Sequence, residues 1–458
     1  MTRSERRLGI VFLLSLIFLH PSVRGDGAGY YAWVRAPLIQ HNFDFQNDWR
    51  HGFPGIDWGR PDGVGNVNLL QWTTAGHLSN HYAVGSALLW APFLIVAHLG
   101  VLAANSLGAH IAADGFSRPY LFALAIGTAF YGFCALLFAF RWARRYFDER
   151  WALLATIGIW LASSFPAYLY WDLSWSHIPS AFAAGLFLLY WDCTRGEVTL
   201  RRWGWLGLAG ALMANIYYVN AIFLLLPALE AIAIGWSAFR GPRDGRSSFL
   251  QLAAANVFFL CIFALGMLPT LITKEIIYGS MFHSGYRQIS EWHWSSPKLF
   301  AILFSSDHGL LSWTPILILS LAGLVIARKR LGGLVKFLVP AIVIFYYVIA
   351  SYVFWDGVTS FGNRFFVSLT PIFVLGLAGT LDGFARCWRE PRGALVRASL
   401  VVALLALWNV GFLYQWSTEL INQRGPVLWS EVLYNQFRKV PHDAGRDLIG
   451  RLSGGMLR

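Results

Sequence analysis

Apolar runs of about 20 residues recur along most of the sequence, and this is the length that crosses a bilayer as an α-helix. The backbone of such a segment must satisfy its own hydrogen bonds in hydrocarbon, and the sequence lacks the alternating strands of a membrane barrel. Composition agrees, because 56% of the residues are hydrophobic and only 13% are charged, too few to cover a globular surface. We therefore predict an all-α polytopic membrane protein with about eleven to thirteen transmembrane helices.

Arginine and lysine residues cluster between the apolar runs and orient them. Cytoplasmic loops of membrane proteins carry an excess of these residues, so the N-terminus with Arg3, Arg6 and Arg7 is predicted to be cytoplasmic. The net charge of +12 is explained in this way, and no nucleic acid partner is expected. The same rule places five later basic loops in the cytoplasm: residues 141–150, 195–202, 240–246, 328–336 and 386–397.

Residues 82–104 do not fit this alternation. They are apolar enough to span, but a crossing here would carry the arginines of residues 141–150 to the outside. We therefore predict that this segment is re-entrant or lies along the outer interface, as segments buried in protein can at membrane depth. The predicted organisation is a transmembrane domain at residues 1–415, with a first outer loop at residues 24–81, and a C-terminal tail at residues 416–458 on the outer face.

Acidic, histidine and tryptophan residues gather in the predicted outer loops, whereas the cytoplasmic loops are short and basic. A long outer loop in a compact protein is more often functional than idle. A carboxylate can take a proton from an acceptor hydroxyl, or hold a divalent metal that neutralises a phosphate leaving group. Arginines such as Arg287 and Arg364 can bind phosphate through paired donors. The outer face is therefore the predicted place of any chemistry, with Asp26 in its glycine-rich segment as the first candidate.

Several short motifs together resemble the GT-C superfamily of integral-membrane glycosyltransferases. In order along the chain they are GDGAGYY at residues 25–31, NFDFQND at 42–48, NHYAVG at 80–85, Ser176-His177, GLLSWTP at 309–315 and SFGNRF at 360–365. They look like those of uncharacterised bacterial members of the branch that contains protein O-mannosyltransferases and lipid A aminoarabinose transferases. Asp26 matches the acidic residue that this superfamily has in its first outer loop, although the chain has one acid where mannosyltransferases have a pair.

The resemblance implies a function and a set of site residues. A sugar would pass from a polyprenyl-phosphate-linked donor to a lipid, glycan or protein acceptor on the periplasmic face of a bacterial inner membrane. Asp26 would be the catalytic carboxylate and, if a divalent cation takes part, its ligand. The expected partners are the donor and membrane lipids. Residues predicted to bind substrate or the lipid phosphate are Arg364, Arg287, Tyr30, Tyr31, His81, Tyr82 and His177, and the supporting acids are Asp44, Asp48, Asp307 and Asp356.

The alternative function is a transporter or flippase of a lipid-linked or free saccharide without transferase activity. Such proteins place ionisable residues in the middle of their spans and often repeat their hydropathy pattern. Glu230 is the main ionisable residue within a predicted span, and the two halves of the sequence do not visibly match. The sequence therefore favours the transferase. For Asp44 and Asp48 the alternative is a turn-capping role, and for His81 and His177 the alternative is the more common structural role of a hydrogen-bonded histidine.

Overall fold

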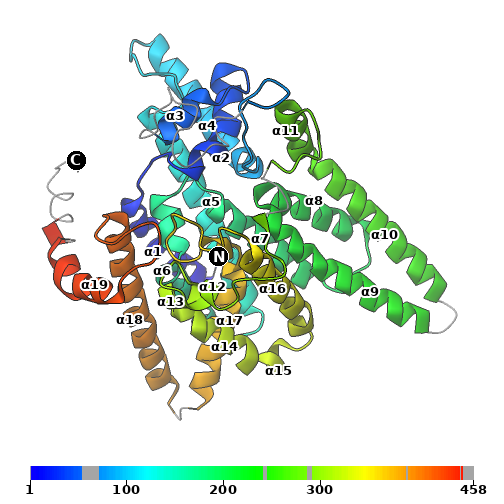
Figure 1. Cartoon of the computed structure of the whole chain (residues 1–458). Helices are drawn as coiled ribbons and strands as arrows, with labels where there is room; N and C mark the ends of the chain where they lie inside the picture. Colours follow the sequence, from blue (N-terminus) through cyan, green and yellow to red (C-terminus); the bar gives the residue numbers. More distant parts are fainter. Residues whose placement is uncertain are drawn as a thin grey trace.

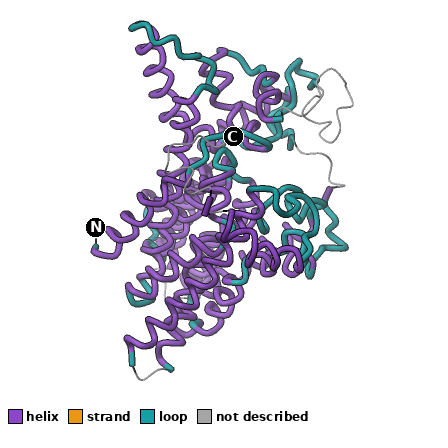
Figure 2. Tube along the Cα trace, turned by 90° about the vertical axis from the view of Figure 1, so that its left-hand side faces the viewer, coloured by secondary structure: helices purple, strands orange, loops and turns teal. Residues whose placement is uncertain are grey.

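The computed structural model describes residues 2–53, 72–240, 245–285, 291–387, 390–443 and 445–446. In these residues the chain is helical, and strand-like pairing is limited to three isolated bridges. Figures 1 and 2 show the helices gathered into one elongated bundle, with α2, α3, α4 and α11 at one end. The predicted all-α architecture is confirmed.

The helices follow one another with short connections. The first half contains α1 (Arg3–Ser15), α2 (Asp26–Arg35), α3 (Gln46–Gly52), α4 (Gly85–Ser106), α5 (Arg118–Arg144), α6 (Glu149–Ala162), α7 (His177–Cys193) and α8 (Leu200–Ile216). The second half contains α9 (Leu225–Arg240), α10 (Gly245–Gly266), α11 (Leu268–Tyr278), α12 (Ala301–Phe304), α13 (Leu310–Trp313), α14 (Ile316–Ile326), α15 (Arg328–Leu331), α16 (Leu334–Ser351), α17 (Thr370–Arg386), α18 (Pro391–Ser417) and α19 (Trp429–Tyr434). Short segments of 3₁₀- or π-helix are Leu16–Phe18, Ala36–Gln40, Ala167–Trp171, Tyr218–Leu224, Arg364–Leu369 and Asn435–Lys439.

Seven helical stretches in the described part of the chain are long and apolar enough to cross a membrane. This is fewer than the predicted number because several apolar runs are broken. The run at residues 151–171 ends as an α-helix at Ala162, shortly before Pro166, a residue type that cannot continue a helix ladder. The α6, α7 and α8 helices consequently have 14, 17 and 17 residues.

Most of residues 82–104, predicted to be re-entrant or interfacial, lie in the α4 helix. It is continuous over 22 residues and is one of the seven long apolar stretches. Yet it pairs with the first half of α5: the Trp90 indole donates to Thr128 at 3.0 Å, and His98 lies 2.6 Å from the Tyr120 hydroxyl. From Thr128, α5 continues for about 20 Å to its basic residues at 1.5 Å per residue. The α4 helix therefore begins beside the middle of α5 and runs away from the basic end of that helix.

The basic loops lie together at the other end of the bundle. Glu5 of α1 accepts from Arg141 at 2.8 Å, and Asp192 of α7 accepts from Arg145 at 3.1 Å. Arg330 of α15 lies over the ring of Phe147 and pairs with Asp382 of α17 at 2.8 Å. These contacts join the N-terminal helix and four of the five predicted basic loops into one surface, called the basic end below.

The α17 helix forms the centre of the bundle, and its apolar window is almost entirely buried. It packs closely against α14, where a Cβ atom on Gly323 would lie 1.8 Å from the carbonyl oxygen of Gly376. Small residues at helix contacts in membranes allow such backbone approach. Because α17 follows the turn that begins at Arg364, this packing fixes the position of that arginine.

Candidate functional site

The segment that carries Asp26 is an α-helix whose glycines permit close packing. Asp26 is the first residue of α2, after Gly25 in the left-handed region at φ 54°. A Cβ atom on Gly27 would lie 1.9 Å from the Ser174 hydroxyl, and one on Gly29 would lie 2.0 Å from the ring of Tyr82. The glycines of the GDGAG motif therefore let α2 reach both neighbours, and this contact brings Asp26 into a group of polar side chains.

Asp26 lies between an arginine and a tyrosine. Its Oδ2 atom is 2.8 Å from Nη1 of Arg364, and its Oδ1 atom accepts a hydrogen bond of 2.8 Å from the Tyr82 hydroxyl. The Asp26 side chain is 28% exposed and that of Arg364 is 12% exposed, so the carboxylate is the more accessible partner. The first turn of a helix also favours negative charge. The predicted catalytic carboxylate and the predicted phosphate ligand are thus direct neighbours.

Arg364 retains unused hydrogen-bonding capacity. Its guanidinium lies over the ring of Trp175, with 4.4 Å from Cζ to the ring centroid. Its Nε and Nη1 atoms are buried without a well-aligned hydrogen-bond acceptor in the described residues, although Nη1 is in ion-pair range of Asp26. Buried donors are usually satisfied, and a planar guanidinium suits paired recognition of an oxyanion. The arrangement therefore suits an anionic group beside Asp26.

Neutral aromatic and imidazole side chains surround this pair. The Tyr30 ring lies 4.8 Å from that of Tyr82, and burial raises the pKa of Tyr30 to about 12. His81 stacks on Tyr82 at 4.1 Å, and burial lowers the pKa of His81 to about 4, so its ring is neutral at pH 7. His177 begins α7 and lies 4.6 Å from the ring of Tyr168. Of the predicted substrate residues, Tyr30, His81 and Tyr82 thus join Asp26 and Arg364.

Two residues of this region were not among the predicted site residues. Trp175 stacks on Arg364, and no sequence signal distinguishes it from the other tryptophans. Lys274 of α11 is buried, and its Nζ atom has no hydrogen-bond partner in the described residues but lies 5.0 Å from the Tyr278 ring. Burial lowers the pKa of Lys274 to about 8, and its charge in turn acts on His81. A lysine inside an apolar stretch is a signal that could have identified it.

A second group of polar residues lies next to Arg364. Asp307, His308 and Asp356 bring one nitrogen and two carboxylate oxygens within 4.8 Å of one another. Asp356 directly precedes Gly357, where a Cβ atom would lie 3.3 Å from Nε of Arg364. Burial lowers the pKa of His308 to about 4, and burial together with the Asp356 charge raises the pKa of Asp307. The two predicted supporting acids of the later loops are therefore brought together at the edge of the site.

The remaining predicted residues lie elsewhere. Asp48 is fully buried in a paired contact with Arg35, at 2.5 Å and 2.6 Å. Tyr31 donates to the carbonyl of Gly115 at 2.6 Å, and Asp44 accepts from the backbone of Gln46 in an exposed turn. These contacts give Asp48, Tyr31 and Asp44 structural partners away from Asp26. Arg287 lies outside the described residues.

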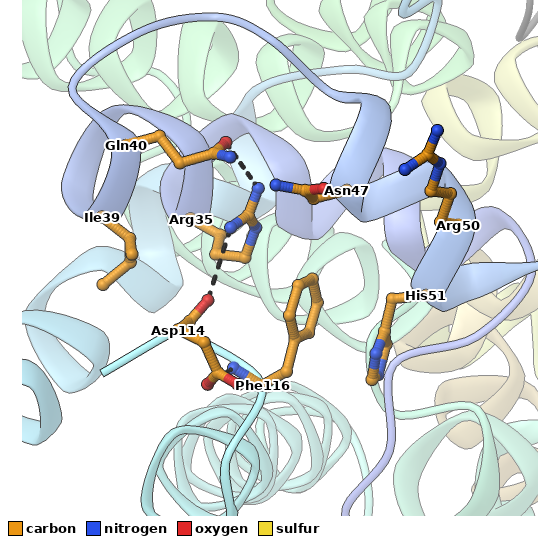
Figure 3. Close-up of a pocket in the computed structure, with 8 residues that line it drawn as sticks. All are labelled: Arg35, Ile39, Gln40, Asn47, Arg50, His51, Asp114 and Phe116. Atoms are coloured by element: carbon orange, nitrogen blue, oxygen red, sulfur yellow. Dashed lines mark hydrogen bonds between the residues drawn. The ribbon is translucent and has the colours of Figure 1, made fainter. Parts of the chain in front are cut away.

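A cavity of about 470 Å³ opens at the far end of α2. Figure 3 shows Arg35 at its centre, bonded to Gln40 and to the carbonyl of Asp114, with Phe116 below. The charge of Arg35 is already neutralised by Asp48. Asp26 lies nine residues earlier, about 13 Å along the helix axis. The cavity therefore offers no unpaired charge from Arg35 and is separate from the Asp26 group.

Comparison with known proteins gives a structural likeness. No protein-family model and no curated protein matches the sequence. Among solved structures, the chain is similar to the archaeal oligosaccharyltransferase AglB from Archaeoglobus fulgidus in complex with an inhibitory peptide and a dolichol-phosphate. That match has a TM-score of 0.50 and 17% identity, and covers 92% of this chain and 56% of the other. It is also similar to the Archaeoglobus fulgidus oligosaccharyltransferase complexed with Zn and sulfate, with a TM-score of 0.51 and 18% identity, covering 92% and 53%.

At this identity the likeness shows a common fold. The chain spans about half the length of the solved structures it matches. Those structures have the GT-C fold, so this chain is a polytopic membrane protein with a GT-C fold. The fold expected from the sequence motifs is confirmed.

Proposed function

We propose that this chain is a membrane glycosyltransferase that moves a sugar from a polyprenyl-phosphate-linked donor to an acceptor hydroxyl. The reaction takes place at the Asp26 group, which faces the periplasmic side of a bacterial inner membrane. The GT-C fold supports this proposal, because the matched oligosaccharyltransferase was solved with a dolichol-phosphate, a lipid phosphate of the expected class. The acceptor is a lipid, a glycan or a protein.

The observation that carries the proposal is the contact between Asp26 and Arg364. Arg364 has buried donors available beside a partly exposed carboxylate. A donor phosphate bound by Arg364 would place the sugar carbon next to Asp26. The acceptor oxygen then attacks that carbon, the bond from the carbon to the phosphate oxygen breaks, and the lipid phosphate leaves as an anion. Asp26 accepts the proton of the acceptor, and Arg364 stabilises the negative charge on the leaving phosphate.

The rings around the pair suit the sugar. Tyr30, Tyr82 and Trp175 present apolar faces with polar edges, the combination that sugar rings stack on. Tyr82 also holds Asp26 by its hydrogen bond, which orients the carboxylate. In this proposal Arg364 binds the phosphate, Asp26 accepts the proton of the acceptor, and the aromatic rings bind the sugar.

Glu230 is the residue that would most support the transporter alternative. Glu230, the ionisable residue within a predicted span, is buried in an ion pair with Arg202 at 2.8 Å. Its other oxygen accepts from the backbone of Gly196 at 2.6 Å, and the indole of Trp191 donates at 2.8 Å. All of these partners lie near the basic loop at residues 195–202. Glu230 therefore has the contacts of a structural residue, whereas the groups with free capacity lie around Asp26.

Donor cleavage tests the proposal. The full chain, reconstituted in liposomes with a polyprenyl-phosphate-linked sugar labelled in the sugar, is expected to release polyprenyl phosphate and transfer the label to an acceptor fraction from bacterial membranes. A transporter would instead move the intact lipid-linked sugar to the other leaflet. Translocation of intact donor without release of polyprenyl phosphate would contradict the proposal.

The orientation of the bundle is testable at the two ends of α18. Cys387 is exposed at the basic end, just before α18, and Thr418 is exposed just after it. With the other three cysteines changed to serine, Cys387 is expected to resist a membrane-impermeant maleimide added outside intact cells. Thr418→Cys in a cysteine-free background is expected to react. Because the two positions flank one helix, labelling of Cys387 and protection of the Thr418→Cys variant would show the opposite orientation.

A further inference from the structure

Two loops that are distant in sequence bring three potential metal ligands together. Asp307 and His308 lie between α12 and α13, and Asp356 lies after α16. One ring nitrogen of His308 and one carboxylate oxygen of each aspartate are all within 4.8 Å of one another. His308 Nδ1 is 3.3 Å from Asp307 Oδ1. These side chains are part of the predicted outer surface but are not needed for proton transfer or phosphate binding in the proposed reaction.

His308 is buried without a satisfactory partner. Its side chain has no exposed surface, and neither ring nitrogen makes a well-aligned hydrogen bond in the described residues. Backbone groups of Asp356 and Gln423 lie near the ring. Its backbone also adopts the left-handed region, at φ 54°. A buried imidazole without hydrogen bonds, on a strained backbone, destabilises the fold. Binding of a ligand by the ring would offset this loss of stability.

Among the described residues, Asp307 also has an oxygen without a hydrogen bond. Oδ1 of Asp307 is buried without a hydrogen-bond partner in the described part of the chain. A carboxylate oxygen of Asp307 and one of Asp356 lie within 4.8 Å of each other, so two carboxylates share one small region. The charge of Arg364 is nearby but is directed at Asp26, at 2.8 Å. A cation held between Asp307 and Asp356 would remove their repulsion.

We propose that Asp307, His308 and Asp356 bind a divalent transition-metal ion of the zinc class. An imidazole with two carboxylates suits zinc better than magnesium, which prefers oxygen and water ligands. Tetrahedral ligands at 2.0 to 2.1 Å from zinc lie about 3.4 Å apart, so small side-chain rotations close the observed spacing. Three protein ligands leave a fourth position open to solvent or to an anionic ligand. The His308 ring could donate its second N–H to one of the neighbouring backbone carbonyls, the usual way of orienting a metal-bound imidazole.

The ion would join segments that surround Arg364. The segment after Asp356 contacts Arg364 through Gly357 and pairs with the C-terminal region through the bridge between Thr359 and Arg424. The segment before Asp307 accepts a hydrogen bond at Ser306 from the backbone of Val427, at 3.2 Å. The metal would therefore join two loops next to Arg364, each of which also contacts the C-terminal region. This inference concerns metal binding and does not depend on the proposed transfer reaction.

Titration with zinc alone tests the site. The detergent-purified full chain, freed of metal by a chelator, is expected to bind one Zn²⁺ in isothermal titration calorimetry and to gain thermal stability from it. Asp356→Asn and Asp307→Asn should each weaken this binding by about 10-fold or more, and the double variant should lose it. Neither carboxylate makes a described side-chain hydrogen bond, so both variants are expected to fold.

Asp44→Asn provides a matched control, because it removes the same charge from an exposed turn and should leave Zn²⁺ binding unchanged. Cobalt substitution adds a spectroscopic readout, since absorption of a low-symmetry Co²⁺ site should disappear in the double variant. Equal Zn²⁺ binding by the wild type and the double variant would overturn the proposal. A preference for Mg²⁺ over Zn²⁺ at these residues would overturn the assignment of the metal class.

Discussion

Asp26→Asn is expected to lower the rate of sugar transfer by about 100- to 10,000-fold, the range that a positioned general base contributes. Asparagine has the same shape, and its carbonyl oxygen can still accept from Tyr82 at the position that the carboxylate uses now. It has no charge, however, and cannot take a proton from the acceptor. The measurement is donor turnover by the reconstituted variant, with polyprenyl phosphate release followed over time.

The control for this variant is Asp382→Asn. Asp382 is also an aspartate paired with arginine, at 2.8 Å from Arg330, but it lies at the basic end of the bundle. Loss of the Asp382 charge is expected to lower the thermal stability of the protein and to leave the rate of sugar transfer nearly unchanged. A wild-type transfer rate in a well-inserted Asp26→Asn protein would remove Asp26 from the mechanism. A slow variant can either bind the donor poorly or transfer the sugar slowly, and a donor-binding measurement distinguishes the two. Asp26→Asn should still bind the donor through Arg364.

The sequence predicts Asp26 as a candidate site residue, but it does not predict why glycines flank this residue. The motif GDGAGYY indicated an acid in a glycine turn, whereas the structure begins a helix at this acid. Gly27 and Gly29 permit that helix to approach Ser174 and Tyr82 closely. Those neighbours follow residue 29 by more than fifty positions, and local sequence carries no information about such distant packing.

The predicted fold class is confirmed, whereas several apolar segments are divided into shorter helices than hydropathy indicates. Hydropathy identifies apolar segments, but it does not report where a helix ends within them. Pro166 and the extended backbone at Tyr217 interrupt apolar runs that hydropathy treats as continuous. Likewise, hydropathy could not decide the course of residues 82–104, because the pairing of α4 with only the first half of α5 is a tertiary property.

Charge pairing was the least predictable part of the candidate site. Asp48 and Asp26 lie in neighbouring motifs and look alike in the sequence, yet Asp48 is buried against Arg35 and Asp26 is accessible beside Arg364. Arg35 lies thirteen residues before Asp48 and Arg364 lies near the other end of the chain. The choice between these partners depends on tertiary packing, which the local sequence around each aspartate does not encode.

Arg364→Lys is expected to raise the KM for the lipid-linked donor and to lower kcat/KM by about 10- to 100-fold, the loss of one charged hydrogen bond. Lysine keeps the positive charge that Asp26 faces, so the variant tests geometry and not charge. It loses the planar fork with its Nε and Nη1 donors, and it loses the flat contact with Trp175. The KM for the acceptor should change little, because the acceptor meets Asp26.

Arg330→Lys is the matched control, since Arg330 also pairs with an aspartate but lies at the basic end. It should leave the donor KM unchanged. The double variant Asp26→Asn/Arg364→Lys adds a further test, because side chains in contact are expected to show non-additive effects. If Arg364 binds the leaving phosphate while Asp26 takes the proton, the double variant should lose less than the sum of the single losses in free energy. Full additivity would mean that the two residues act independently and that their 2.8 Å contact has no part in the reaction.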